Sequence, residues 1–372
     1  MPSGKFETPS SFTPIDRVFM ARAIALTDNG RDTATPNPNV GCVIVKDGII
    51  IGEGWHERAG EAHAEVRALE KAGESARGST AYVTLEPCAH HGRTGPCTDV
   101  LVKAGVKRVV AALEDPFAQV NGRGIAKLRE AGIQVDTGLM AEEAREVHKG
   151  FLSRVVRGRP WMRIKMAASL DGRIALANGE SQWITSEEAR RDVHALRARS
   201  SAMLTGIGTV LRDDPELTVR HVECKRQPRR VVIDSRLDMP LSAKILEGEP
   251  PLILTVSNDA ARRKALEARG AEVVRVTNEG EKTDLAAVAR LLGERGFNEV
   301  TVETGAKLNG SLLRAGVVDE LVIYYAPLLL GDKSQPMFAL PEWTKLGEAM
   351  RLRVVDVRQI GPDVRVTTRF AS

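Results

Sequence analysis

The sequence has few cysteines and no long hydrophobic run. Four cysteines in 372 residues are too few for a disulfide framework, so we expect a reducing, cytoplasmic location. The most apolar stretch, 321–330, contains Pro327 and is far shorter than the roughly 18 residues that a membrane-spanning helix needs. The first 13 residues have neither an apolar core nor a cleavage pattern, which predicts a flexible tail and no secretory signal.

Aromatic residues and excess charge are also scarce. Aromatic side chains make up 4% of the chain, and 53 basic against 49 acidic residues leave a net charge of +4. Neither a basic patch nor a base-stacking surface is indicated, so we expect no nucleic-acid partner and no membrane partner. The 42% of hydrophobic residues and the length instead predict a folded chain of about two domains.

Strand-like and helical patterns alternate along nearly the whole chain, which is typical of an α/β protein. An Asp47-Gly48 pair between two apolar runs predicts a β-hairpin. The basic segment HKGFLSRVVRGRP interrupts the alternation and predicts a domain junction. We therefore expect a tail at 1–13, a first domain at 14–147, a linker at 148–160 and a second domain at 161–372.

One histidine and two cysteines of the first domain form a candidate zinc site. His63 starts a predicted helix, Cys88 follows a predicted strand, and Cys97 comes nine positions later. Three such ligands leave the fourth position of zinc open for water, which marks a catalytic site. Glu65, two residues after His63, is placed to move protons, as in the H-x-E and P-C pattern of zinc nucleobase deaminases.

Other interpretations of these residues stay open. The two cysteines could be inert buried thiols, or His90 or His91 could complete a closed structural zinc site. Cys42 lies in an apolar strand and is expected in the core, whereas Cys224 is expected in an exposed loop.

The second domain contains two glycine-containing segments that follow predicted strands. TGIGTVLRDDP includes Gly206 and Gly208 but has Leu211 where a dinucleotide fingerprint needs its third glycine. VETGAKLNGSLLRAG leads into a predicted helix, whose first amides could bind phosphate. A tight strand-to-helix turn without a ligand is the alternative for this second segment.

The motifs PNPNVGCVIV, HAE, TLEPCAHHGRTGPC, KMAASLDGRIA and SQWIT together resemble the family of bifunctional riboflavin-biosynthesis deaminase–reductases. The resemblance covers the chain from about Pro14 to its end. Eight residues separate the two cysteines, as in that family, whereas nucleic-acid deaminases usually have two. The resemblance implies a cytidine-deaminase-like α/β/α sandwich followed by a dihydrofolate-reductase-like α/β domain.

For the first domain, the resemblance implies one zinc ion per chain and deamination of a diaminopyrimidinone with a ribosylamino 5′-phosphate. Glu65 would move the protons. The substrate would be held by residues of the PNP segment and of the segment after the first cysteine, namely Asn37, His90 and Arg93. Asn37 could also be only a turn residue, and Arg93 only a loop cation.

For the second domain, the resemblance implies NADPH-dependent reduction of the ribosyl group to ribityl. The implied cofactor residues are Ala167, Trp183, Thr209, Asp213, Ser235, Gly305, Ala306, Lys307 and Leu308. The implied substrate residues are Lys165, Ser181, Arg197, Leu217, Arg220 and Glu303. Arg197 and Arg220 suit a phosphate, although Arg197 could belong to a solvated helix face. Thr304 departs from the small residue expected there.

The sequence thus predicts an enzyme with two active sites, phosphorylated pyrimidine substrates, and a homo-oligomeric state, dimer or tetramer. Two alternatives remain. A tRNA or nucleoside deaminase is disfavoured by the cysteine spacing. A zinc-stabilised binding module would need a fourth protein ligand and would tolerate the loss of Glu65.

Overall fold

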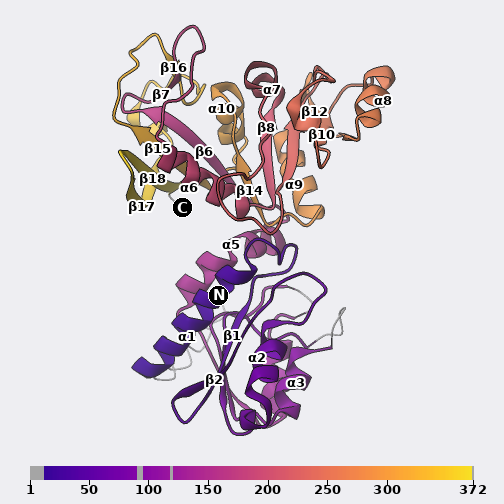
Figure 1. Cartoon of the computed structure of the whole chain (residues 1–372), viewed down its shortest axis with the longest axis vertical. Coiled ribbons are helices and arrows are strands. Elements are labelled where there is room, and N and C mark those ends of the chain that lie inside the picture. The colour runs from indigo at the N-terminus through magenta and orange to yellow at the C-terminus, as the bar shows by residue number, and fades with distance from the viewer. Residues whose placement is uncertain (1–11, 90–94, 118–119, 371–372) are drawn as a thin grey trace. The chain divides into compact units, whose positions relative to one another are not determined.

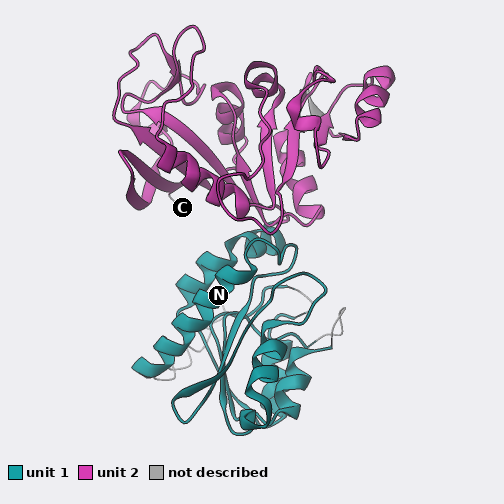
Figure 2. Cartoon of the chain, viewed as in Figure 1, with its two compact units in different colours: residues 1–157 teal, residues 158–372 magenta. Residues whose placement is uncertain are grey.

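The chain forms two compact units, which we treat separately (Figure 2). Unit 1 comprises residues 1–157 and unit 2 residues 158–372. The computed structural model describes residues 12–89, 95–117 and 120–370. Within these ranges, every helix is too short or too polar to cross a membrane.

Unit 1 is a three-layer α/β/α sandwich. Its five-stranded sheet has the order β2-β1-β3-β4-β5, with β1 antiparallel to β2 and β3 and the remaining pairs parallel. The elements are α1 (Pro14–Leu26), β1 (Gly41–Lys46), β2 (Ile49–Trp55), α2 (Ala64–Ala72), β3 (Thr80–Val83), α3 (Cys97–Lys103), β4 (Arg108–Ala111), α4 (Arg123–Glu130), β5 (Gln134–Thr137) and α5 (Ala141–Arg157).

The alternation of apolar side chains along β1 builds two cores in unit 1. Cys42 and Ile44 pack with residues of α2, α3 and α4. Val43 and Val45 point to the other face and pack with residues of α1 and α5. Figure 1 shows α1 and α5 together on one side of this sheet. Cys42 is fully buried, which confirms it as a core residue.

The predicted linker at 148–160 is mostly helical, which corrects the sequence-based expectation. α5 continues to Arg157 and belongs to unit 1. His148 and Phe151 are buried, and Phe151 joins the core that lies between α1, α5 and the sheet. Exposed basic residues and small buried ones, such as Gly150 and Ser153, concealed this helical periodicity from the sequence analysis.

Unit 2 is built on a nine-stranded sheet with the order β11-β10-β9-β8-β14-β6-β15-β18-β17. Its strands are β6 (Trp161–Ser169), β8 (Ala202–Gly206), β9 (Arg229–Ile233), β10 (Leu252–Thr255), β11 (Glu272–Arg275), β14 (Glu299–Val302), β15 (Glu320–Ala326), β17 (Leu352–Ile360) and β18 (Asp363–Phe370). Two small two-stranded sheets pair β7 (Arg173–Ala175) with β16 (Gln335–Pro336) and β12 (Asn278–Glu279) with β13 (Lys282–Thr283). Its helices are α6 (Glu187–Ala198), α7 (Ile207–Asp213), α8 (Ala260–Ala268), α9 (Leu285–Glu294) and α10 (Ala306–Arg314).

Seven strands of the large sheet, from β11 to β15, run parallel, and the C-terminal hairpin β17–β18 adds two antiparallel strands at one edge. Helices α9 and α10 pack on one face of the sheet, while α6, α7 and α8 cover the other. The carboxyl ends of parallel strands meet at one edge, which is where open α/β sheets bind their ligands.

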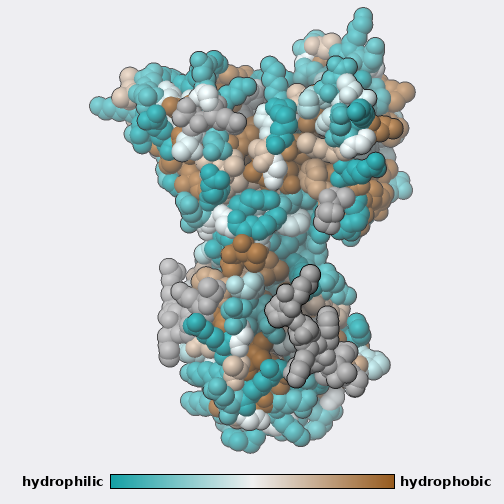
Figure 3. All heavy atoms as spheres, turned by 180° about the vertical axis from the view of Figure 1, so that it is seen from behind, coloured by the Kyte–Doolittle hydropathy of each residue, from teal (hydrophilic) through white to brown (hydrophobic). Residues whose placement is uncertain are grey.

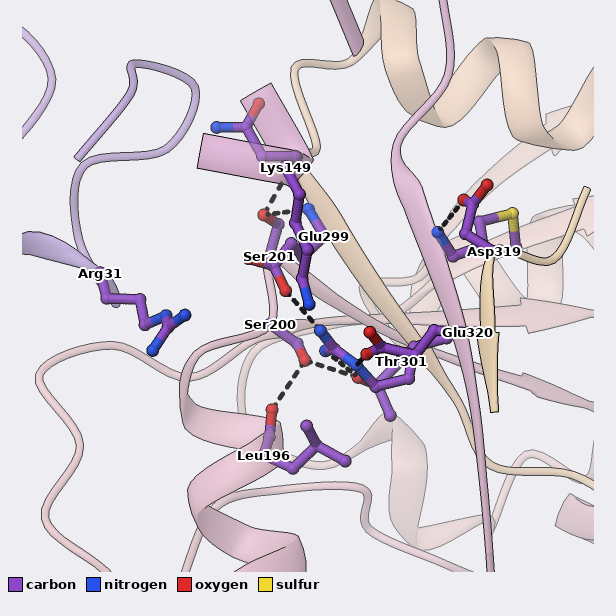
Figure 4. Close-up of polar contacts among 12 residues, drawn as sticks. Arg31, Lys149, Leu196, Ser200, Ser201, Glu299, Thr301, Asp319 and Glu320 are labelled. Carbon is purple, nitrogen blue, oxygen red and sulfur yellow. Dashed lines mark hydrogen bonds and ion pairs between the residues drawn. The ribbon is translucent and has the colours of Figure 1, made fainter. Parts of the chain in front are cut away.

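A fully buried arginine joins three strands of unit 2 beneath α6. Arg163 on β6 donates to Glu299 at 2.6 Å, to Glu320 at 2.7 Å and to Thr301 at 3.3 Å. Figure 4 shows Ser200 beside Thr301, with 2.7 Å between their hydroxyl oxygens. A buried charge needs such partners, so this network fixes β6, β14 and β15 relative to one another.

Candidate active sites

The start of helix α2 places two residues of the predicted zinc site. His63 is the N-cap of α2, and Glu65 lies in its first turn. The helix lies directly on β2 because two glycines there have no side chain. A Cβ atom at Gly54 would come within 2.2 Å of the Ala64 carbonyl oxygen, and one at Gly52 within 2.1 Å of the Ala68 carbonyl oxygen. This close packing fixes His63 and Glu65 against the sheet.

The two cysteines lie where β3 leads into α3. Cys97 is the first residue of α3, and its backbone N–H donates to the Cys88 sulfur at 3.4 Å. The Thr98 N–H donates to the Cys88 carbonyl at 3.2 Å. The start of α3 therefore holds Cys88 and favours a negative charge on its sulfur.

The predicted ligands come together in the structure. The His63 Nδ1 lies 3.2 Å from the Cys97 sulfur and 3.6 Å from the Cys88 sulfur, and all ligand atoms lie within 4.8 Å of one another. Hydrogen bonds from the Cys97 thiol and from His63 lower the pKa of Cys88 to about 4, although burial opposes this. One imidazole and two thiols in this arrangement fit a tetrahedral zinc ion.

Glu65 is the acid–base candidate beside this cluster. Its side chain is 3% exposed, and burial raises the pKa of its carboxyl group. A raised pKa makes a carboxylate a better proton acceptor, which suits a group that must take a proton and pass it on. His90 and His91, which could complete a closed structural site, lie outside the described residues.

A cavity of about 470 Å³ opens onto the cluster within unit 1. Asn37 lines it, and its amide nitrogen lies 3.0 Å from the His56 Nε2, while the His56 Nδ1 lies 3.3 Å from the Ala62 carbonyl oxygen. Burial lowers the pKa of His56, which favours the neutral ring that this pairing needs. Of the predicted substrate residues, Asn37 is thus placed at the cavity, whereas His90 and Arg93 lie outside the described residues.

A buried carboxylate, Glu86, connects part of the wall of this cavity to the zinc ligand Cys88. Glu86 accepts backbone N–H groups from Asp115 (3.1 Å), Gly122 (3.0 Å), Gly124 (2.8 Å) and Ile125 (3.1 Å). Asp115 also lines the cavity, and burial raises its pKa to about 6. Since Glu86 is two residues before Cys88, it links the 115–125 segment to a zinc ligand.

The charged centre of unit 2 lies at the carboxyl end of β14 and beside the middle of the neighbouring β6. Lys165 and Glu303 share one face of these neighbouring strands, and their charged groups are 3.2 Å apart. Arg197 donates to both Glu303 oxygens, at 2.7 and 2.9 Å, and to the Thr218 carbonyl at 3.0 Å. Burial would raise the pKa of Glu303, but Arg197 and Lys165 hold that pKa well below its usual range.

A cavity of about 890 Å³ surrounds this centre and brings most of the predicted residues of unit 2 together. All six predicted substrate residues line it, namely Lys165, Ser181, Arg197, Leu217, Arg220 and Glu303. Five predicted cofactor residues line it as well, namely Ala167, Trp183, Thr209, Asp213 and Gly305. Four predicted cofactor residues do not: Ser235 follows β9, with its hydroxyl 2.9 Å from that of Thr283, and Ala306, Lys307 and Leu308 form the first turn of α10.

Exposed side chains at the rim of this cavity are suited to a ligand. Trp183 is 71% exposed, and the Arg190 guanidinium lies 4.7 Å from the centre of its ring. Thr304, where a smaller residue was expected, places its hydroxyl 3.3 Å from that of Thr209. His194 accepts the Arg220 backbone N–H at 3.0 Å, and burial lowers the pKa of His194 to about 4.

The sequence analysis missed several residues of the unit 1 site. It assigned no role to His56, Glu86, Asp115 or Arg154. Glu86 stands inside the TLEPC motif, so a signal existed, but its hydrogen-bond partners are about 30 to 40 positions away. Arg154 had no signal, because it lies in the segment that was interpreted as a linker.

Comparisons with known proteins agree with the division of the chain into two units. The family model of the cytidine and deoxycytidylate deaminase zinc-binding region matches residues 14–113. The model of the RibD C-terminal domain matches residues 160–366. Together, the two matches cover the zinc cluster and the charged centre of unit 2.

Relatives that match nearly the whole chain also contain both regions. The riboflavin biosynthesis protein RibD of Escherichia coli is 49% identical, covering 94% of this chain and 98% of that protein. The Haemophilus influenzae protein of that name is 45% identical, covering 96% and 98%. The solved structure of Acinetobacter baumannii RibD superposes with a TM-score of 0.89 at 42% identity, covering 96% of this chain and 99% of that one. A Thermotoga maritima diaminohydroxyphosphoribosylaminopyrimidine deaminase/5-amino-6-(5-phosphoribosylamino)uracil reductase gives 0.83 at 34%, with the same coverage.

Proposed function

The chain belongs to the RibD family of riboflavin-biosynthesis proteins, and from this membership we propose how its residues divide the two activities. It is a bifunctional enzyme with a zinc-dependent deaminase and an NADPH-dependent reductase. The deaminase hydrolyses the 2-amino group of 2,5-diamino-6-ribosylamino-4(3H)-pyrimidinone 5′-phosphate, and the reductase converts the ribosyl group of the product to ribityl. We assign the deaminase to residues 14–157 and the reductase to residues 158–370.

The cluster of His63, Cys88 and Cys97 beside the buried Glu65 carries the deaminase assignment. Zinc bound by the three ligands supplies a positive charge that lowers the pKa of a water molecule toward neutrality. Glu65 accepts a proton from the attacking water and passes it to the ring nitrogen. Glu65 then accepts the remaining proton of the added hydroxyl group and delivers it to the departing amino group, so that the ring carbon becomes a carbonyl, water is consumed and ammonia is released. Asn37, held by His56, orients the pyrimidine ring.

The reductase cavity fits a nicotinamide cofactor together with a phosphorylated sugar. When bound, NADPH would supply the hydride that reduces the first carbon of the opened sugar. Gly305 caps α10 without a side-chain hydrogen bond, which leaves the first amides of this helix available to a phosphate group of the cofactor. Trp183 at the rim offers an aromatic face, and Thr209 and Asp213 lie on the adjoining helix α7.

Lys165 is the proton donor that the cavity of unit 2 offers. Opening of the sugar ring requires a proton on the ring oxygen, and the side-chain nitrogen of Lys165 lines the cavity 3.2 Å from Glu303. Arg197 has three nitrogen atoms engaged by Glu303 and Thr218, so it mainly positions Glu303. Arg220, whose side chain is 47% exposed, is then better placed than Arg197 to bind the substrate phosphate.

A cytoplasmic location and a homo-oligomeric state, dimer or tetramer, are also part of this proposal. All four cysteines are free thiols, and a reducing compartment keeps Cys88 and Cys97 available for zinc. The edge strand β17 exposes Leu352 (42%), Val354 (58%) and Val357 (58%), which favours association of copies along this edge. Figure 3 shows hydrophobic atoms interspersed over the surface of unit 2.

Removal of the metal tests the division into two activities. We expect a chelator to abolish ammonia release, because unit 1 supplies the zinc ligands, and added zinc to restore it. The chelated protein should still oxidise NADPH when given the deaminated substrate. Ammonia release that survives complete removal of zinc would contradict the proposal.

A further inference from the structure

The cavity of unit 1 contains a cation that the zinc chemistry does not use. The proposed substrate carries a 5′-phosphate at the end of its ribosyl group, away from the ring carbon that must lie at the zinc cluster. A phosphate dianion taken into a cavity needs positive charge or hydrogen-bond donors there. The inference below therefore rests on the proposed deaminase function.

Helix α5 presents this cation to the cavity. Phe151, Arg154 and Val155 follow the spacing i, i+3, i+4 and all line the cavity, so they form one face of the helix. Among the described residues that line the cavity, Arg154 is the only arginine or lysine. Burial lowers the pKa of Arg154, which means that its charge has lost part of its hydration.

The Pro36–Asn37 segment connects Arg154 to the residues beside the zinc cluster. Its Nη2 donates to the Pro36 carbonyl at 2.8 Å, and its guanidinium lies 5.7 Å from the centre of the Phe151 ring. The neighbouring Asn37 contacts His56, whose ring centre lies 5.1 Å from that of His63. Arg154 thus contacts the backbone next to the residue that is proposed to orient the pyrimidine ring.

We propose that Arg154 binds the 5′-phosphate of the deaminase substrate. The guanidinium presents a planar set of donors, so it can donate to Pro36 and to a phosphate oxygen at the same time. This role makes Arg154 a specificity residue for phosphorylated substrates.

A comparison of two substrates separates this role from support of the Pro36–Asn37 segment. Ammonia release is measured with the phosphorylated diaminopyrimidinone riboside and with the same riboside after dephosphorylation. The variant R154Q removes the charge but keeps an amide that can donate to Pro36. The matched control is R145Q on the same helix, because Arg145 is 54% exposed, pairs with Glu142 and does not line the cavity.

We expect R154Q to raise KM for the phosphorylated substrate by roughly 10- to 100-fold, the value of a hydrogen bond to a charged group. Its KM for the dephosphorylated riboside should equal that of the wild type, and R145Q should match the wild type with both substrates. Inorganic phosphate should inhibit the wild type competitively and R154Q more weakly.

The proposal would be overturned if R154Q raised KM equally for both substrates, or raised it for neither. If R154Q failed to retain zinc, R154K would decide, because lysine keeps the charge but not the fork of donors. A KM increase of R154K confined to the phosphorylated substrate would support the proposal, and an equal loss with both would refute it. Absence of ammonia release from the zinc-loaded wild type with either substrate would instead refute the deaminase function itself.

Discussion

Replacing Glu86 by glutamine tests how the deaminase cavity is held together. One Glu86 oxygen accepts the N–H groups of Gly124 and Ile125, and the other accepts those of Asp115 and Gly122. The amide oxygen of glutamine can keep the first pair of bonds. Its NH2 group would face the second pair, which leaves two buried donors without an acceptor.

Each buried donor without a partner costs about 1–3 kcal/mol, so the substitution should cost unit 1 about 2–6 kcal/mol. Much of this cost should appear locally, because the four amides belong to a single segment. Gly124 adds to the constraint, since a Cβ atom there would come within 1.9 Å of the Pro87 carbonyl oxygen. Loosening this segment therefore also loosens the connection to Cys88.

Hydrogen exchange and zinc content provide the assay. In E86Q, the amides of Asp115 and Gly122 should exchange at least tenfold faster, and zinc should dissociate faster than from the wild type. NADPH oxidation with the deaminated substrate should be unchanged. The matched control is E114Q, which makes the same chemical change at an exposed side chain of the same segment. Wild-type exchange and zinc retention in E86Q would refute the reasoning.

Two further predictions concern Lys165 and His148. The substitution Lys165→Met should lower kcat of the reductase by about 100-fold or more and leave ammonia release intact, because it removes the proposed proton donor; an unchanged NADPH oxidation rate would contradict this role. Burial lowers the pKa of His148 from 6.5 to about 4. Between these two pH values, the unfolded state binds a proton that the folded state does not bind. Stability from the neutral ring is therefore present above pH 6.5 and is lost as the pH falls toward 4, by up to about 3 kcal/mol. Urea unfolding of unit 1 should show this loss in the wild type and not in His148→Gln, and parallel pH profiles of the two proteins would refute it.

The zinc site could be predicted from the sequence because local structure fixes it. His63 and Glu65 belong to one helix start, and Cys88 and Cys97 flank one short segment, so their spacing determines how they meet. Lys165 and Glu303 were named only through the resemblance to the family, and the structure places them side by side on the neighbouring parallel strands β6 and β14.

The residues that the sequence did not reveal depend on contacts between distant segments. Arg154 reaches Pro36 across 118 positions, and Glu86 binds amides up to 39 positions away. The helix that carries Arg154 was hidden because small and polar residues form much of its buried face. The C-terminal hairpin β17–β18 was also missed, since β17 exposes apolar residues and lacks the alternation of a half-buried strand.

The most direct test of two independent active sites in one chain compares the wild type with Glu65→Gln. Each protein receives the diaminopyrimidinone ribosyl phosphate and NADPH, and ammonia release is followed together with the loss of NADPH absorbance. The wild type should show both signals. Glu65→Gln should show neither with this substrate, yet should oxidise NADPH at the wild-type rate with the deaminated substrate. A zinc-loaded wild type that releases no ammonia, or a Glu65→Gln variant that releases it at the wild-type rate, would contradict the account.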